Sequence, residues 1–357
     1  MKKTLALVLS LVMLLSLAAC GGSGNQAAAD GAGNDGDASN DPAVKLVYAE
    51  VNPLDTIVGQ TDTFFAEKVA ELTGGTVTLD VQAAGVLGSE NDVLDAMVGG
   101  SDSIDISRIS AFALSNYGCS KATLLSIPYT FTGRAHFWAF ANSDMAAEFL
   151  NEPQEVGIPL RGLFYGEEGF RHFFFKNEVK GLEDLKGLKI RVQQSPTNVA
   201  MMELLGGTAT PMGFGDVYTA LQSQIINGAE NNELALTSNG HGDVCKYYSY
   251  DMHQMIPDLV LCNWAFLEGL SESERAVFDE GFKIINSVQR AEWTGAVEAA
   301  KEQALNEQGV NFLYPDTAPF QQAVMPLHNQ VLEGNPALQP IYDMIQAYNA
   351  EFSAAAE

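Results

Sequence analysis

Strand-like and helix-like segments alternate at the start of the chain's folded part, and this alternation narrows the possible folds more than any other feature. The stretches VKLVY (44–48) and TVTLDV (76–81) have the pattern of strands, and a further short strand is predicted at 103–106. Between them, 62–72 and 90–98 carry apolar residues at helical spacing, and each ends at a pair of glycines. This order predicts an α/β fold with a mostly parallel sheet covered by helices.

A second α/β unit is predicted from about residue 160 onward. Ser195 and Pro196 have the residue types of a helix N-cap and first helical position, and Gly206 and Gly207 close the helix that follows. Strands are predicted at 161–166, 170–176, 188–192, 208–211 and 310–314, and helices at 197–205 and 216–225.

One helical pattern is longer than a single domain. It begins after Ser271, with Glu274 placed to complete a capping box, and continues to Gln308. A helix of roughly 35 residues at 1.5 Å each spans about 50 Å, which exceeds the diameter of one domain. We therefore expect two domains, with this helix running along both of them or kinking between them.

The N-terminus has the features of a lipoprotein signal. Lys2 and Lys3 precede an apolar run that ends in small residues and Cys20. We interpret 1–19 as a lipoprotein signal peptide and Cys20 as the lipid attachment point; an ordinary signal peptide with a chance cysteine is the alternative. The rest of 20–42 is rich in Gly, Ala, Asn and Asp, which predicts a flexible acidic tether.

Composition excludes several functions. The chain has 45 acidic and 19 basic residues and a formal net charge of −26, which disfavours nucleic acid and broad contact with an anionic membrane surface. Cys119, Cys245 and Cys262 lack metal-like spacing; Cys245 and Cys262 can pair, or all three are buried thiols. No catalytic motif, metal site or cofactor site is evident, so we expect no cofactor; many enzymes lack such motifs, so this alone does not exclude an enzyme.

Arg191 is one of only seven arginines, and its position is unusual. Alternation in LKIRV (188–192) places the apolar residues on one face and Lys189 and Arg191 on the other. Arg191 lies near the end of the strand, before the polar run 193–195 and a helix N-terminus, where α/β sheets bind ligands. A guanidinium there suits a carboxylate. A structural ion pair is the competing interpretation, which composition alone favours.

Other candidate residues have simpler interpretations when each is taken alone. Arg171 begins an aromatic strand, where it can be a solvated charge. Glu230 and Asn231 follow a turn and can line the same crevice or satisfy loop backbone. Phe214 is either an apolar floor or core, and His253 has no partner at metal-like spacing.

Three stretches together resemble the extracytoplasmic substrate-binding proteins of TRAP transporters, the DctP-type receptors. They are ELTGGTVTLDVQAAGVLGSENDVLDAMVGG (71–100), GLEDLKGLKIRVQQSP (181–196) and PMGFGDVYTALQSQIINGAENN (211–232). The resemblance covers nearly all of the chain after the tether.

The resemblance implies roles for particular residues. The arginine of LKIRV binds the substrate carboxylate in this family, which points to Arg191, and an upstream arginine that also reaches the substrate corresponds to Arg171. Further contacts are implied for Phe214 and Asn231. The implied ligand-binding set is completed by residues that supply polar groups, namely Glu50, Asn52, Arg108, Glu230, Asn232 and His253.

The resemblance also implies the fold and the function. It implies a two-domain periplasmic-binding-protein-like fold, each domain a mixed sheet flanked by helices, with the ligand cleft between them. We assign 43–168 and about 257–296 to domain I, and 169–256 and about 297–357 to domain II. The resemblance further implies that ligand binding closes the domains, that the receptor docks on a permease of one small and one large membrane subunit, and that the receptor itself is not an enzyme.

The resemblance narrows the ligand to an organic acid. The stretches GAENN, KYYSYDMHQMIPD and VQRAEW resemble the branch that takes hexuronates such as glucuronate or galacturonate. A C4-dicarboxylate receptor is the alternative. Alternatives of other classes are a lipid-anchored extracytoplasmic enzyme, a structural surface lipoprotein and the binding protein of an ATP-driven importer. We expect a monomer anchored outside the cell membrane by its lipid.

Overall fold

The structure, a computed structural model, describes residues 43–352. The predicted signal peptide, Cys20 and the acidic tether lie outside the described residues. Within 43–352 the strands are β1 (Val44–Ala49), β2 (Val77–Gln82), β3 (Ile106–Ser110), β4 (Leu160–Phe175), β5 (Lys189–Val192), β6 (Thr208–Pro211), β7 (Gly228–Asn231), β8 (Tyr247–Asn263) and β9 (Asn311–Leu313).

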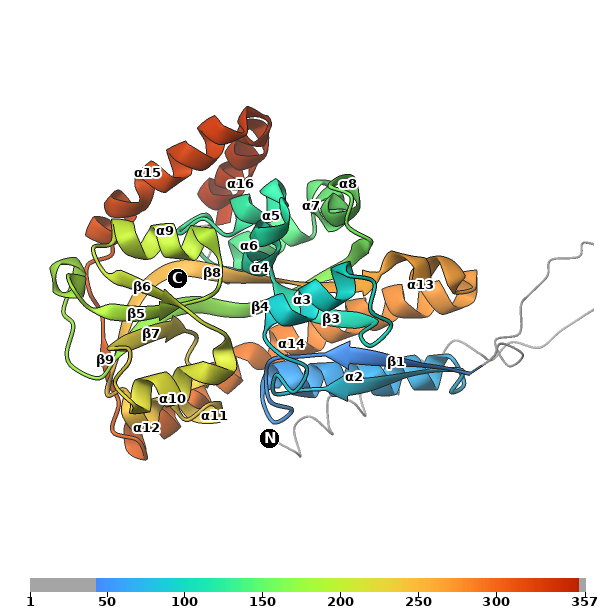
Figure 1. The fold of residues 1–357 in the computed structure, drawn as a ribbon, viewed down its shortest axis with the longest axis horizontal. Coiled ribbons are helices and arrows are strands. Elements are labelled where there is room, and N and C mark those ends of the chain that lie inside the picture. The colour runs from blue at the N-terminus through green and yellow to red at the C-terminus, as the bar shows by residue number, and fades with distance from the viewer. Residues whose placement is uncertain (1–42, 353–357) are drawn as a thin grey trace, which may run out of the picture. The chain divides into compact units, whose positions relative to one another are not determined.

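Helices cover this sheet on both sides, as Figure 1 shows. The helices of the described range are α2 (Ile57–Leu72), α3 (Glu90–Val98), α4 (Ala111–Leu114), α5 (Ser120–Leu125), α6 (Arg134–Ala141), α7 (Asp144–Leu150), α8 (Glu152–Glu155), α9 (Pro196–Leu204), α10 (Val217–Gln222), α11 (Leu234–Ser238), α12 (His241–Val244), α13 (Trp264–Gly269), α14 (Glu272–Asn306), α15 (Ala318–Gly334) and α16 (Gln339–Phe352). In that range, no helix is both long enough and apolar enough to cross a membrane.

The sheet consists of two parallel parts joined by two long antiparallel strands. Its order is β2-β1-β3-β8-β4-β7-β5-β6, and β9 pairs with β8. We call β2, β1 and β3 the first half-sheet and β7, β5 and β6 the second half-sheet; neighbouring strands within each are parallel. In Figure 1, β4 and β8 pass from one half-sheet to the other. The predicted α/β fold is confirmed, and its parallel and antiparallel strands form one continuous mixed sheet that both halves share.

The strand β4 is continuous where the sequence predicted two segments. It spans 16 residues, and its pairing with β8 shifts register at three places, including between Glu167 and Phe170. Phe173, Phe174 and Phe175 are buried because β4 has neighbours on both edges and layers on both faces. These three rings therefore belong to the core.

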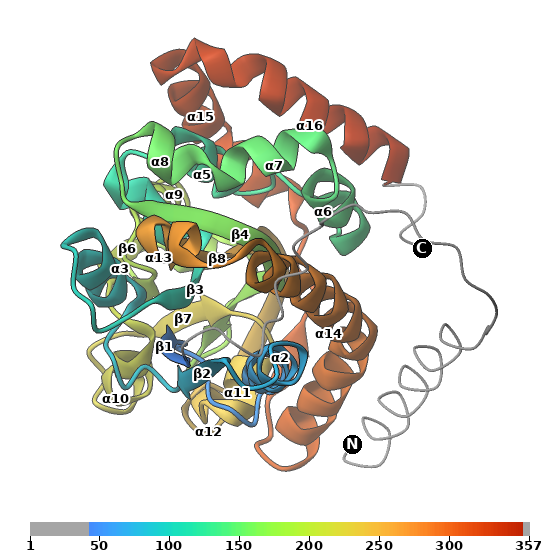
Figure 2. The ribbon, with the colours of Figure 1, turned by 90° about the vertical axis from the view of Figure 1, so that its right-hand side faces the viewer.

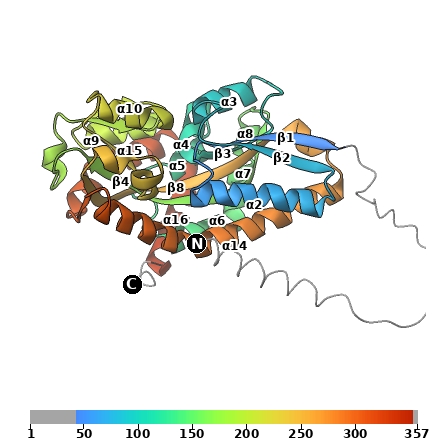
Figure 3. The same cartoon turned by 90° about the horizontal axis from the view of Figure 1, so that it is seen from below.

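The long helix forms as predicted and lies along both half-sheets. Ser271 caps α14, and the reciprocal contacts between Ser271 and Glu274 complete the capping box. α14 packs against α2, next to the first half-sheet, and against α11, next to the second. Figure 3 shows it running below both. The division into domains I and II at particular residues stays a prediction.

The C-terminal helices α15 and α16 lie together over the helices of the chain's middle, as Figure 2 shows. Two buried histidines fix this arrangement through backbone carbonyls. His328 Nε2 lies 2.7 Å from Pro128 O, and His136 Nε2 lies 2.6 Å from Ile345 O.

Several local predictions differ from the structure. The third strand occupies Ile106–Ser110 and not 103–106, because 101–105 form the turn that leads into it. The helices α5 to α8 and the 17-residue strand β8 were not predicted. β8 is buried along most of its length and contains Pro257 and the left-handed residue Met252, so it shows no regular alternation.

The three described cysteines are free and buried. Cys245 and Cys262 therefore form no disulfide with each other, and the alternative of buried thiols holds. Burial raises the pKa of the Cys245 thiol to about 12, which keeps it protonated and unreactive at neutral pH.

Gly169 occupies a position in β4 that a side chain would disturb. Its φ is +67°, and a Cβ built there would lie 2.8 Å from Cζ2 of Trp293 on α14. We expect Gly169→Ala to lower the free energy of unfolding by about 2 kcal/mol or more, since left-handed strain and a clash with an indole combine. Urea unfolding of the purified protein measures this.

Gly215→Ala is the matched control for that variant. Gly215 is exposed, and a Cβ there would have no atom within 4 Å. Its unfolding midpoint should stay close to that of the wild type. Equal midpoints for both variants would contradict the role of Gly169.

Candidate ligand-binding site

A pocket lies where strands of both half-sheets end. β1 leads into Val51 and Asn52, β3 ends at Ser110, β5 leads into Gln193, and β7 ends at Asn231. In α/β sheets, this edge is where ligands bind. The residues that line the pocket are Val51, Asn52, Ser89, Glu90, Asn91, Ser110, Glu168, Arg171, Arg191, Gln193, Gln194, Met212, Gly213, Phe214, Asn231 and Asp258.

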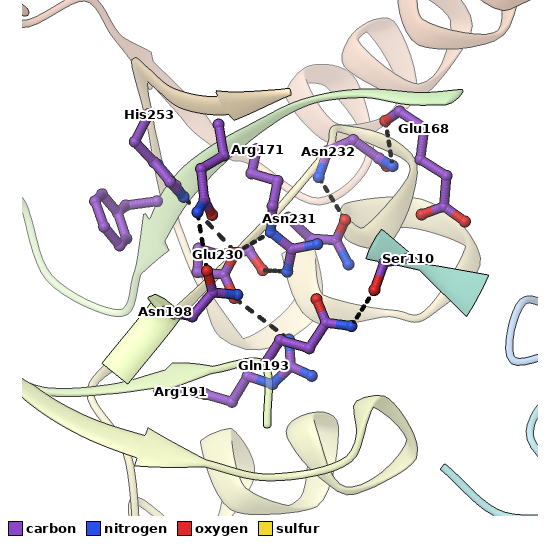
Figure 4. Close-up of polar contacts among 12 residues, drawn as sticks. Ser110, Glu168, Arg171, Arg191, Gln193, Asn198, Glu230, Asn231, Asn232 and His253 are labelled. Atoms are coloured by element: carbon purple, nitrogen blue, oxygen red, sulfur yellow. Dashed lines mark hydrogen bonds and ion pairs between the residues drawn. The ribbon is translucent and has the colours of Figure 1, made fainter. Parts of the chain in front are cut away.

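Two arginines share one buried carboxylate at this pocket. Glu230 on β7 is 0 % exposed; Arg171 on β4 and Arg191 on β5 are 3 % and 2 % exposed. Arg171 donates through Nε to Glu230 Oε2 and through Nη2 to the Glu230 carbonyl at 3.0 Å. Nη1 of Arg191 lies 3.5 Å from Glu230 Oε1. Figure 4 shows the three side chains converging.

A backbone carbonyl also holds Arg191. Its Nε and Nη2 both donate to the carbonyl of Met212, at 3.1 and 2.9 Å. That carbonyl occupies the Nε edge of the guanidinium. Arg191 is thus both a structural ion-pair partner and a residue of the pocket wall, so the two interpretations of the sequence do not exclude each other.

Each guanidinium also faces an aromatic ring. The Cζ of Arg191 lies 5.7 Å from the ring centroid of Phe214, and that of Arg171 lies 5.5 Å from the ring of Phe112. These cation–π contacts position the arginines without neutralising their charge.

Burial and ion pairing shift the titration of the cluster. Burial alone would raise the pKa of Glu230, but the nearby guanidinium of Arg171 and its other partners lower it to about 2. Burial lowers the pKa of Arg191 to about 10, although Glu230 opposes this. At neutral pH both arginines and Glu230 are charged, and the three groups carry a net charge of +1.

His253 lies behind this cluster on β8. Its Nδ1 is 2.7 Å from Asp251 Oδ2, and its Nε2 is 3.7 Å from Glu230 Oε2. Burial opposes protonation of the imidazole, but Asp251 and Glu230 outweigh it and raise the pKa of His253. The ring stacks on Phe173.

Side chains from the two half-sheets meet across the pocket. Gln193, after β5, donates through Nε2 to Glu90 Oε2 and to Ser110 Oγ, beside β3. Asn91 and Asn116 donate through Nδ2 to the carbonyl of Gln194, at 3.2 and 2.7 Å. The pocket is therefore bridged by hydrogen bonds from one half-sheet to the other.

Five residues that the sequence predicted line this pocket. They are Arg171, Arg191, Phe214, Asn231 and Asn52. Ser195 precedes α9 as predicted, but its side chain makes no capping hydrogen bond. The direct ligand contacts of these residues stay predictions.

The other five predicted residues lie behind the lining. Arg108 is engaged by Asp258, whose Oδ2 lies 2.9 Å from Nε and 2.8 Å from Nη2. Glu50 accepts from the backbone and side-chain nitrogens of Asn52, at 2.6 and 2.8 Å. Glu230 lies under the arginines, Asn232 donates to the carbonyl of Glu168 at 2.9 Å, and His253 is fully buried.

Sequence reasoning missed several lining residues as ligand candidates, above all the carboxylates Glu90, Glu168 and Asp258. Glu90 begins α3, which follows a predicted strand, so the sequence could have placed it near the carboxyl end of that strand, where ligands bind. Glu168 and Asp258 lie within β4 and β8, and nothing local distinguishes them among 45 acidic residues. Across 43–352, no three His, Cys, Asp or Glu residues are placed to hold a metal ion.

Comparison with known proteins assigns the family. Residues 48–335 match the model of the DctP family, described as bacterial extracellular solute-binding protein, family 7. The chain belongs to this family. The uncharacterized protein YiiZ of Salmonella typhimurium is 32% identical over 304 residues, which cover 85% of this chain and 90% of that protein.

Two solved structures of TRAP periplasmic solute-binding proteins are similar throughout. The protein from Anaerococcus prevotii, with bound α/β-D-glucuronate, is 45% identical with a TM-score of 0.82, covering 86% of this chain and 99% of that one. The protein from Xanthobacter autotrophicus, with bound β-D-galacturonate, is 32% identical with a TM-score of 0.80, covering 85% and 99%.

Removal of the charge on Glu230 should destabilise the protein. We expect Glu230→Gln to lower the free energy of unfolding by about 3 kcal/mol or more, because two buried guanidinium groups lose their shared counter-charge. Urea unfolding at neutral pH checks this. The exposed Glu203→Gln variant on α9 should change it by less than about 0.5 kcal/mol; similar values for both would contradict this account of the cluster.

Proposed function

We propose that this protein is the substrate-binding receptor of a TRAP-type secondary transporter and that it captures a hexuronate such as glucuronate or galacturonate. The observation that carries the proposal is the pair of buried arginines that line the pocket while sharing a single carboxylate. Because this cluster keeps one positive charge, it attracts an anion into a chain of net charge −26.

The geometry of the cluster supports a carboxylate as the bound group. Nη1 of Arg171 and Nδ2 of Asn231 have no hydrogen-bond partner among the described residues, and both residues line the pocket. Together with the Nη1 side of Arg191, they offer donors from three strands. Charge-assisted hydrogen bonds from such donors to a carboxylate are short and strong.

The rest of the lining supports a polyhydroxylated acid. Asn52 and Ser110 on the side of the first half-sheet, Glu168 on β4 and Gln193 after β5 present amide, hydroxyl and carboxylate groups. These groups suit the hydroxyls of a sugar acid. Solved relatives with bound glucuronate and galacturonate support the same ligand class.

The hydrogen bonds that bridge the pocket suggest how ligand capture leads to delivery. Ligand binding favours the closed arrangement in which Gln193 and Gln194 meet the first half-sheet. The closed receptor then delivers its ligand to a permease of one small and one large membrane subunit. We propose that it acts as a monomer outside the cell membrane, held by a lipid on Cys20, and that it releases its ligand chemically unchanged.

Replacement of Arg191 tests the proposal. We expect Arg191→Ala to weaken D-glucuronate binding, measured by calorimetry, by about 100-fold or more. Truncation of a buried charge partner costs about 2–5 kcal/mol, and 1.4 kcal/mol is tenfold in affinity. Arg191→Lys should recover part of the loss, because it restores the charge but not the planar fork.

Arg161→Ala is the matched control. Arg161 packs over the ring of Trp264 at 5.0 Å and does not line the pocket, so its removal should leave affinity unchanged. Unfolding curves confirm that each variant is folded. Wild-type affinity in folded Arg191→Ala would overturn the proposed carboxylate site.

A further inference from the structure

The wall of the pocket that faces the arginine cluster is acidic. Glu90, Glu168 and Asp258 all line the pocket. Glu90 is hydrogen-bonded to Ser110 at the end of β3, and Glu168 accepts from Asn52 after β1, so both carboxylates lie on the side of the first half-sheet. Their charges raise the pKa of Arg171, so they also act on the cationic cluster. A ligand that extends from the arginines toward the first half-sheet therefore meets these carboxylates.

Only one of the three carboxylates is neutralised by a basic partner. Arg108 pairs with Asp258 through two nitrogens. Glu168 and Glu90 form no ion pair with any described residue. Glu90 is instead held by neutral donors, the backbone and hydroxyl of Ser110 at 2.5 and 3.1 Å and the amide of Gln193. Burial raises the pKa of Glu90, and the hydrogen bonds from Ser110 oppose that rise. The wall therefore holds two carboxyl groups without a basic counter-charge, and a ligand in the pocket lies beside them.

The same wall has acceptors that lack donors. Oε1 of Glu168 accepts from Asn52 Nδ2 at 2.6 Å, but its Oε2 has no donor among the described residues. The Oδ1 of Asp258 likewise has none. Gln193, which follows β5 and donates to Glu90 from the opposite half-sheet, is only 9 % exposed, and its Oε1 is buried without a hydrogen-bond partner.

Of these three acceptors, Oε1 of Gln193 is buried without a donor, which is costly. Ligand hydroxyl groups can donate to all three. A second carboxylate brings no donor at neutral pH. It also places a like charge beside Glu90 and Glu168, which disfavours the complex.

We propose that Glu90 and Glu168 are specificity residues that admit an acid with one carboxylate and hydroxyl donors at its other end and exclude dicarboxylates of similar length. This inference rests on the proposed function, because it takes the arginine cluster as the carboxylate site. Because Glu90 and Glu168 disfavour a second carboxylate on the ligand, the inference favours a hexuronate over a C4-dicarboxylate without reference to any relative.

The test compares D-glucuronate with D-glucarate, which carries a carboxylate at each end of the same carbon chain. Calorimetry on the purified wild-type protein should give an affinity for glucarate lower by more than about 100-fold, since like-charge contacts cost several kcal/mol. In Glu90→Gln and Glu168→Gln the ratio of the two affinities should narrow by about tenfold or more. Glucuronate forms a ring and glucarate does not close in the same way. This difference between the ligands is the same for every variant, so it cancels when the affinity ratio of a variant is compared with that of the wild type.

Glu148→Gln is the matched control, because it removes one negative charge from an exposed position on α7 and should leave the ratio unchanged. Near-equal binding of both acids by the wild type, or an unchanged ratio in both pocket variants, would overturn the inference and leave the proposed function standing. If the wild type binds neither glucuronate nor galacturonate, or takes succinate and malate instead, the proposed function itself fails.

Discussion

A single buried carboxylate allows two guanidinium groups to lie side by side at this pocket. Without Glu230, Arg171 and Arg191 would repel each other in a site from which water is largely excluded. With it, the cluster keeps one positive charge and a fixed geometry. The three residues come from adjacent strands, since β7 lies between β4 and β5, so the pairing of the second half-sheet determines the position of the charge.

The sheet also explains how one pocket draws on distant parts of the chain. The two half-sheets end at the same edge, and the long strands β4 and β8 connect them. β4 carries both Glu168 and Arg171, three residues apart, so a single strand supplies one group to the acidic wall and one to the cationic cluster. The bulge between Glu167 and Phe170 separates these two groups and places Gly169 against Trp293 of α14.

Much of this arrangement follows from the sequence. Regular periodicity indicated α2, α3, α9, α10 and the long helix α14, and the motif around Arg191 placed that residue at the end of a strand beside a pocket. The conflict between anion binding and ion pairing at Arg191 was not resolvable from the sequence, because the partner, Glu230, is 39 residues away. In the structure, Arg191 forms the ion pair with Glu230 and also lines the pocket, where it can bind an anion.

The rest depends on long-range contacts that local patterns do not encode. The engagement of Arg108 by Asp258 joins residues 150 positions apart, and it withdraws a predicted ligand-binding arginine from the pocket lining. β8 lacks alternation because it is buried through the centre of the sheet. Glu168 and Asp258 reach the pocket through the pairing of β4 with β8, and Asp258 is held there by Arg108.

A crystal structure of the protein with D-glucuronate tests the central claim most directly. The account predicts the ligand carboxylate within about 3 Å of nitrogens of both Arg171 and Arg191, with the sugar hydroxyls toward Glu90 and Glu168. A carboxylate placed away from both arginines, or a ligand bound outside this pocket, would contradict the account.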